Sequence, residues 1–235
     1  LTSGVANASL LLDFPVAWDD ESEPEHCETS LDGTVIVSIQ ETSQILIFNV
    51  SDVTSDTISS YTVVDLPNDG GTSDDGESVE GEPDGLFISP DGTMALISME
   101  RNGTFQMMSL PDGAMYGNPY IMEADLADGW QRDDRSYKKR TEPEECSLVE
   151  QDGKLYAVFA MQEAHAVMVY DVTDPANPVY DSIAPAGIAW EEDNGMEKST
   201  IGSEGLGMHP TNGIAFSANE REGSITMFTA QWARE

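Results

Sequence analysis

Short apolar runs separated by polar turns recur along the whole chain. Val35-Ile36-Val37 and Ile45-Leu46-Ile47-Phe48 are typical, and similar runs are rich in β-branched and aromatic residues. Within these runs hydrophobicity alternates with a period near two, and turn signals follow one another about every 8 to 12 residues. This pattern predicts an all-β fold built from short antiparallel strands.

A repeated acid marks the start of four similar segments. The acids Glu25, Asp84, Glu144 and Glu204 are spaced by 59, 60 and 60 residues. Their surrounding motifs are Glu23-Pro24-Glu25, Glu82-Pro83-Asp84-Gly85-Leu86, Glu142-Pro143-Glu144 and Ser203-Glu204-Gly205-Leu206. Such even spacing indicates an internal repeat of about 60 residues.

Each repeat predicts a meander of antiparallel strands. After the acid comes a pair that supplies positive φ for a tight hairpin: Asp32-Gly33, Asp91-Gly92, Asp152-Gly153 and Asn212-Gly213. A second strand follows, and a third is predicted at residues 45–50, 104–110, 167–172 and 224–229. An outer strand is predicted at 61–66, near Tyr120, and at 179–183. A repeat of this length with four antiparallel strands is typical of a β-propeller blade.

The repeats divide the chain into blades and linkers within a single propeller unit over residues 1–235. The predicted order is blade 1 at 23–67, an acidic loop at 68–81, blade 2 at 82–126, a basic loop at 127–140, blade 3 at 142–184, a loop at 185–202 and blade 4 at 203–230. Blade 4 ends after its third strand. The apolar stretch 9–14 either supplies its outer strand and closes a four-bladed ring, or belongs to a preceding blade of a larger ring of about seven blades. We favour the larger ring, because four-bladed propellers are the rarest size.

The charge of the chain restricts its partners. There are 10 Lys and Arg against 44 Asp and Glu, so the formal net charge is -34. Nucleic acid is excluded as a direct partner because phosphate binding needs clustered cations, and anionic membranes are disfavoured for the same reason. No apolar run approaches the roughly 18 residues of a membrane span. Three Asn-x-Ser/Thr sequons, at Asn7, Asn49 and Asn102, favour an extracellular, cell-surface or periplasmic location.

The two cysteines lie at equivalent places in the repeat. Cys27 and Cys146 each follow the repeated acid by two residues, in blades 1 and 3. In a ring of six or more blades the intervening blade keeps them beyond the roughly 7 Å between Cα atoms that a disulfide allows. We therefore predict that they are not bonded to each other.

The repeated acids are the main candidates for chemistry. The start of a blade's first strand and the end of its second lie at the same rim, which places Glu25, Asp84, Glu144 and Glu204 with Glu41, Glu100, Gln162 and Glu220. Two carboxylates about 7 Å apart repel by roughly 2 kcal/mol at an effective dielectric constant of 20. The rim therefore predicts one of three outcomes: a bound hard cation such as Ca²⁺, raised pKa values that keep some acids neutral, or carboxylates that accept backbone N–H groups of the next blade.

Three tryptophans share a sequence context. Trp18, Trp130 and Trp190 each precede a blade and are followed by acidic pairs. Either they are flat platforms on which a sugar or cationic ligand stacks, or each packs at the base of its loop against the blade. The chain contains no paired-histidine zinc motif, nucleophile elbow, phosphate loop or dinucleotide fingerprint.

Several of these segments resemble one known family. Residues 142–158 and the run Val167-Met168-Val169-Tyr170-Asp171-Val172-Thr173-Asp174-Pro175-Ala176-Asn177-Pro178-Val179 are similar to the choice-of-anchor I family, which includes the mesenchyme-specific cell surface glycoproteins. Residues 203–206 with 218–228 resemble its last blade, and 23–25 with 37–41 an earlier one. The resemblance implies the C-terminal half of an extracellular or periplasmic propeller of about seven blades. It implies no catalytic mechanism.

Two function classes follow. The first is a non-enzymatic adhesion, matrix or envelope module that presents an acidic, cation-binding face to protein or glycan partners, which include other copies of the chain or the missing half of the propeller. The second is a calcium-dependent hydrolase of phosphate esters or lactones, with its site at the channel mouth. We favour the first, because each blade offers the same acid and no single base stands out.

Overall fold

The structure, a computed structural model, describes residues 23–54, 57–67, 81–128, 130, 140–186, 202–209, 214–220 and 223–229. Within these residues four antiparallel sheets are formed, which we call blades 1 to 4. Blade 1 consists of β1 (Pro24–Thr29), β2 (Thr34–Ile39), β3 (Gln44–Asn49) and β4 (Tyr61–Asp65), and blade 2 of β5 (Pro83–Ile88), β6 (Met94–Met99), β7 (Thr104–Ser109) and β8 (Met115–Ile121). Blade 3 consists of β9 (Pro143–Gln151), β10 (Lys154–Met161), β11 (Ala166–Asp171) and β12 (Val179–Pro185), and blade 4 of β13 (Ser203–Met208), β14 (Ile214–Asn219) and β15 (Ser224–Thr229).

Every blade is a meander whose strands pair in chain order. The predicted all-β fold is therefore confirmed. Three of the predicted hairpin turns contain a glycine at positive φ, namely Gly33, Gly92 and Gly153, with φ of 88°, 74° and 76°. The fourth predicted turn, Asn212-Gly213, and the apolar stretch 9–14 lie outside the described residues.

Helices are minor elements of the described chain. Two short 3-10 helices, η1 (Val50–Asp52) and η2 (Met122–Asp125), follow β3 and β8. Neither is long or apolar enough to pass through a lipid bilayer.

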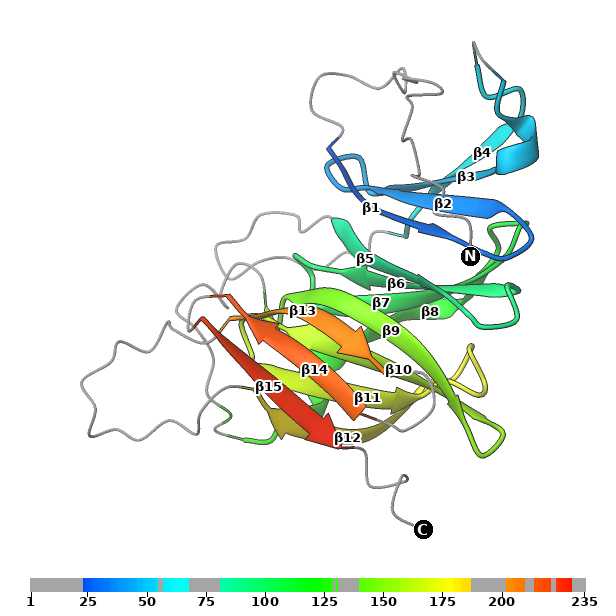
Figure 1. The fold of residues 1–235 in the computed structure, drawn as a ribbon. Helices are drawn as coiled ribbons and strands as arrows, with labels where there is room; N and C mark the ends of the chain where they lie inside the picture. Colours follow the sequence, from blue (N-terminus) through cyan, green and yellow to red (C-terminus); the bar gives the residue numbers. More distant parts are fainter. Residues whose placement is uncertain are drawn as a thin grey trace, which may run out of the picture.

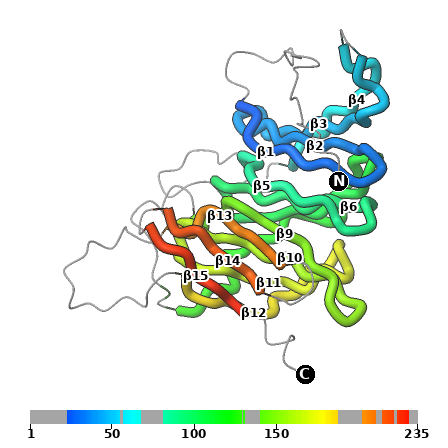
Figure 2. Tube along the Cα trace, viewed as in Figure 1, coloured from blue at the N-terminus to red at the C-terminus, as the bar shows by residue number. Residues whose placement is uncertain are grey.

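The blades stack face to face in chain order (Figure 1), from blade 1 in blue and cyan to blade 4 in orange and red (Figure 2). Their first strands are neighbours, because β1 contacts β5, β5 contacts β9 and β9 contacts β13. Stacked meanders whose first strands contact one another in succession form a propeller-like arrangement.

The contacts between blades repeat from one blade to the next. We call the face of a blade that points toward the next blade in the chain its leading face, and the opposite face its trailing face. Three apolar residues at equivalent positions, one in the second strand and two in the third, form the centre of each leading face. They are Ile36, Ile45 and Ile47 in blade 1, Leu96, Phe105 and Met107 in blade 2, and Val158, Val167 and Val169 in blade 3. Each set packs against the trailing face of the following blade.

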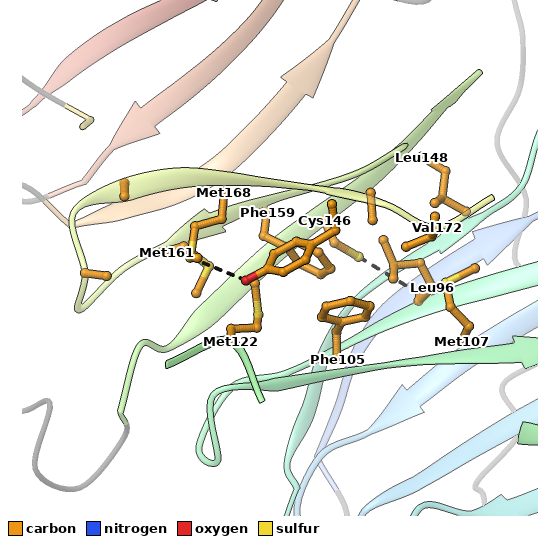
Figure 3. Close-up of a cluster of buried hydrophobic side chains, with 14 residues drawn as sticks. Leu96, Phe105, Met107, Met122, Cys146, Leu148, Phe159, Met161, Met168 and Val172 are labelled. Atoms are coloured by element: carbon orange, nitrogen blue, oxygen red, sulfur yellow. Dashed lines mark hydrogen bonds between the residues drawn. The ribbon is translucent and has the colours of Figure 1, made fainter. Parts of the chain in front are cut away.

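The densest part of the core lies between blades 2 and 3 (Figure 3). The ring centroid of Phe105 lies 4.8 Å from that of Phe159 and 5.1 Å from that of Tyr170. The Tyr170 hydroxyl lies 3.1 Å from Asp125 Oδ2, so the only polar atom of this side chain has a partner. Met122, Met161 and other sulfur-containing side chains fill the remaining space around the rings.

Cys146 belongs to this core, and its Sγ lies 4.0 Å from the carbonyl oxygen of Leu96 in blade 2. Cys27, at the equivalent position of blade 1, is exposed, and both cysteines are free thiols.

The packing between blades 2 and 3 predicts a large cost for truncating Phe159. Phe159→Ala should lower the free energy of unfolding by about 3 to 5 kcal/mol, because the ring is fully buried and its removal leaves a cavity. Val179→Ala on the outer strand β12, where Val179 is 61% exposed, should change it by no more than about 0.5 kcal/mol. Urea unfolding of the two variants measures both values. A loss below about 1 kcal/mol for Phe159→Ala would contradict the interface described here.

Candidate functional site

The repeated acid lies at a β-bulge in every blade. The pairing of the first two strands shifts register between Pro24 and Cys27 in blade 1, and at the corresponding place in each of the other three blades. Glu25, Asp84, Glu144 and Glu204 fall at these shifts. A bulge changes the direction of the side chains that it carries, and bulges are common beside functional sites.

The residue that directly precedes the first strand of each blade has a left-handed backbone. Glu23, Glu82 and Glu142 have φ of 35°, 44° and 48°, and Gly202 takes this place in blade 4 with φ of 55°. The carbonyl oxygen of each accepts a hydrogen bond from the backbone N–H at the end of the second strand, from Gln40, Glu100, Gln162 and Glu220 respectively. Three non-glycine residues in this region carry strain, which persists only where the surrounding contacts determine it.

These hydrogen bonds correct one of the predicted equivalences. Gln40, and not Glu41, occupies the position of Glu100, Gln162 and Glu220. Glu41 is exposed in the turn that follows. The Gln40 Nε2 donates to Glu100 Oε2 at 2.8 Å, so blade 1 contributes an amide donor to the rim where an acid was expected.

Serine hydroxyls join each bulge to the preceding blade. Ser38 Oγ in blade 1 lies 3.0 Å from the carbonyl oxygen of Asp84, and Ser98 Oγ in blade 2 lies 3.0 Å from that of Glu144. Gly85 allows this approach, because a Cβ there would lie 2.5 Å from the carbonyl oxygen of Glu144. The backbone of the repeated acid is thus held by the neighbouring blade, and its side chain is available for other contacts.

Three carboxylates from two blades converge at this rim. Glu100, at the end of β6, meets Glu142 and Glu144, at the start of β9, and one oxygen of each lies within 4.8 Å of the others. Glu142 is fully buried and Glu100 is 6% exposed. We call these three side chains, together with Asp84, the acidic cluster.

The electrostatics of the acidic cluster favour bound protons or cations. Burial raises the pKa of Glu144, and a hydrogen bond to Asp84 with repulsion from Glu100, Asp84 and Glu142 raises it further. Burial also raises the pKa of Glu25 and of Glu204, with repulsion from Asp84 acting on both. The electrostatic influence of Asp84 therefore reaches the repeated acids of the other three blades, and the three predicted outcomes stay open.

A second group of polar side chains lies along the first strands. His26 Nδ1 in β1 is 3.7 Å from Glu145 Oε2 in β9. Burial raises the pKa of Glu145, whereas the nearby His26 and the backbone N–H of Cys146 lower it. From here a cavity of about 770 Å³ extends along all four first strands to the hairpins of blades 1 and 2.

Of the three predicted tryptophan positions, the structure describes only Trp130. Trp130 is half-buried, its Nε1 donates to the carbonyl oxygen of Ala164 at 2.8 Å, and its ring packs against the core, which agrees with the packing interpretation. Trp18, Trp190 and Asn7 lie outside the described residues.

The two described sequons differ in exposure. Asn102 is fully buried, and its Oδ1 accepts from Thr104 N, so the folded protein has no space for a glycan there and this expectation is corrected. Asn49 is half-buried, and its Nδ2 donates to the carbonyl oxygen of Asp32 at 3.2 Å.

Glu142 is the site residue that the sequence analysis did not select. Its signal was present, because an acid precedes proline in three of the four motifs, at Glu23, Glu82 and Glu142. Only the structure distinguishes them, since Glu82 pairs with Arg101 whereas Glu142 is in the acidic cluster.

The sequence matches a known protein family over part of its length. Residues 112–175 match the family model of the choice-of-anchor I domain, from the start of β8 to the end of β11. The match confirms, over this part of the chain, the resemblance noted from the sequence. No curated protein matches the sequence.

Solved structures show a similar fold at low sequence identity. A putative 6-phosphogluconolactonase from Bacteroides uniformis superposes with a TM-score of 0.57 and 16% identity, over 88% of this chain and 50% of that one. A protein from Lactobacillus plantarum gives 0.57 and 14%, over 89% and 52%. A catalytically inactive virginiamycin B lyase from Staphylococcus aureus, solved with quinupristin, gives 0.54 and 14%, over 91% and 57%. The chain thus spans about half the length of these propeller-like structures.

The raised pKa values predict that the protein is more stable at pH 5.5 than at pH 8 when chelator is present. A carboxyl whose pKa is higher in the folded than in the unfolded state binds its proton more tightly when folded, so its stabilisation is present at low pH and is lost as pH rises above about 4.5. Thermal unfolding at the two pH values measures the difference.

Two variants distinguish the contribution of the acidic cluster to this pH dependence from the contribution of the overall negative charge. Glu144→Gln should reduce the difference between the two pH values, whereas Glu150→Gln, at the other end of β9, removes one equal charge and should leave it nearly unchanged. An equal effect of both substitutions would assign the pH dependence to overall repulsion.

Proposed function

We propose that the chain is a non-enzymatic binding module whose acidic cluster holds a hard cation such as Ca²⁺ at the rim of a propeller. The observation that carries the proposal is the convergence of Glu100, Glu142 and Glu144 within 4.8 Å. Carboxylate oxygens are the ligands that Ca²⁺ prefers, and its coordination tolerates irregular geometry.

A cation would neutralise the repulsion among these carboxylates. Glu100 belongs to blade 2 and Glu144 to blade 3, so one ion between them would join two blades. Asp84 adds a further carboxylate from the start of β5. In this proposal the ion stabilises the blade interface, and the exposed part of the rim, including Glu25 and Glu220, presents negative charge to a partner.

We propose further that the four blades are part of a larger ring and that the protein acts outside the cell. Support for the ring comes from the solved structures, of which the chain spans about half. Support for the location comes from the choice-of-anchor I match and the negative charge of the chain. Protein or glycan partners suit such a module.

A hydrolase acting at the channel mouth is the second candidate. One of the similar structures is described as a putative lactonase and another as a lyase, and the cavity along the first strands has the volume of a small-molecule site. At 14 to 16% identity these likenesses support the fold alone. A screen against lactones and phosphate esters, with and without Ca²⁺, distinguishes the two candidates, because only the hydrolase gives metal-dependent turnover.

The cation proposal predicts specific stabilisation by Ca²⁺. Relative to chelator, Ca²⁺ at about a hundred times its Kd stabilises the folded state by about 2.7 kcal/mol and should raise the melting temperature by roughly 5 to 11 °C. Glu144→Gln should lose this rise, and in chelator it should melt no lower than the wild type, because it removes a carboxyl whose ionisation is opposed by burial.

The control is Glu150→Gln, which should keep the full response to Ca²⁺. Na⁺ at equal ionic strength should give the same small shift in all three proteins, since it only screens the charge. An equal Ca²⁺ response in the wild type and Glu144→Gln would contradict a site at the acidic cluster.

A further inference from the structure

The three positions held by Glu100, Glu142 and Glu144 recur at the other blade interfaces with different residues. They are the end of the second strand of one blade, the residue before the first strand of the next blade, and the repeated acid of that next blade. The interface of blades 1 and 2 has Gln40, Glu82 and Asp84 there, and that of blades 3 and 4 has Gln162, Gly202 and Glu204. Of these three described interfaces, only that of blades 2 and 3 has a carboxylate at every position.

The interface of blades 1 and 2 receives a positive charge from the protein itself. Arg101, which directly follows the end of β6, forms an ion pair with Glu82. Glu82 is only 8% exposed, so its carboxylate is largely removed from water and needs such a partner. In blade 3 the residue equivalent to Arg101 is Glu163, which is also buried. That position therefore cannot supply a positive charge in blade 3.

The ion pair is an observation independent of the acidic cluster, and it indicates that this place in the repeat binds positive groups. Glu82 and Glu142 have nearly the same φ, 44° and 48°. The carbonyl oxygen of each accepts the backbone N–H at the end of the second strand. Because the backbone holds both acids alike, what differs is their surroundings. Glu82 meets a guanidinium, whereas Glu142 meets the carboxylates of Glu100 and Glu144.

We infer that Arg101 is a built-in substitute for the bound cation. It neutralises Glu82 and so restricts the described rim to a single ion, which lies between blades 2 and 3. The inference rests on the proposed function, since it takes the acidic cluster to hold Ca²⁺. It makes Arg101 the residue that decides how many ions the described rim binds.

Without Arg101 the interface of blades 1 and 2 would offer its own set of oxygen ligands. Glu82 and Asp84 supply carboxylates at the positions of Glu142 and Glu144. Gln40 donates through Nε2 to Glu100 at 2.8 Å, so its Oε1 is the side-chain atom that can bind an ion. Carboxylates together with a side-chain amide oxygen are a usual ligand set for Ca²⁺.

The substitution Arg101→Gln tests the inference. In chelator the variant should melt at a lower temperature than the wild type, because Glu82 loses its counter-charge at a largely buried position. With Ca²⁺ at about a hundred times Kd for each site, the rise in melting temperature should be about twice that of the wild type, since a second ion binds. Calorimetric titration with Ca²⁺ should give about two ions per chain where the wild type gives about one.

Three control variants identify the cause of such a gain. Arg101→Lys keeps the positive charge and should behave as the wild type does. Arg101→Gln/Glu82→Gln removes both members of the ion pair and should return the Ca²⁺ response to that of the wild type. Lys154→Gln removes an equal charge from the Lys154–Asp171 pair, in which Nζ lies 2.8 Å from Oδ2, and should leave the response unchanged.

A fourth variant separates the two sites. Arg101→Gln/Glu144→Gln should lose the ion between blades 2 and 3 and keep the one between blades 1 and 2, and so should bind about one Ca²⁺. Protein prepared in Ca²⁺ and then dialysed against chelator provides both states of each variant.

Failure of the inference and failure of the proposed function give different results. If the wild type responds to Ca²⁺ through Glu144 and Arg101→Gln responds no more strongly, the inference is overturned and the proposed site stands. An equal gain in Lys154→Gln would also overturn the inference, because it would assign the gain to overall charge. A wild type without any specific Ca²⁺ response would overturn the proposed function and the inference with it.

Discussion

The close contact between the first strands of neighbouring blades is the constraint on which the rest of the structure depends. Between blades 2 and 3 it requires a glycine, because a side chain at Gly85 would collide with the backbone of β9. The serine hydroxyls of Ser38 and Ser98 satisfy the bulged carbonyl groups that this contact brings together. Buried backbone groups must be paired, so the bulge and the serine are needed together. Their joint effect is that the repeated acids of successive blades come within electrostatic reach of one another.

The apolar interfaces make that arrangement of acids tolerable. Each carboxyl that is buried in its charged form opposes folding, and repulsion among Glu100, Glu142 and Glu144 adds to the cost. The cluster persists because the adjoining core, with Phe105, Phe159 and Tyr170, buries far more apolar surface than the acids occupy. The acids do not stabilise the fold by themselves. Burial and mutual repulsion make the charge of these acids sensitive to nearby protons or cations, and this is why the acidic cluster, and not the Trp-bearing loops, is the better candidate site.

The sequence predicted the features that local chemistry determines. The strands, the glycines of the hairpins and the 60-residue repeat follow from patterns within a few residues of each position, and the structure contains them. The sequence also placed Glu144 and Glu100 at one rim. It did not identify Gln40 as the equivalent of Glu100, because the hairpin between the first two strands is one residue shorter in blade 1 than in blade 2, as the pairs Cys27–Val37 and Leu86–Ile97 show. Glu142 was missed for a related reason, since its burial depends on the neighbouring blade and leaves no mark in its own motif.

The two ends of the blade stack differ in a way that follows from the same repeat. A blade that lies inside the stack has both faces covered, so its apolar residues are needed for folding and carry no information about partners. On blade 4 the same positions hold Phe216, Ile225 and Met227, although polar residues there would avoid an exposed apolar face on a highly charged chain. On blade 1 the first-strand position is Cys27, where blades 2 and 4 have leucine. The apolar character of the pattern is thus kept at both ends of the stack, where no described blade requires it. This is expected if further blades of the proposed larger ring cover these two surfaces.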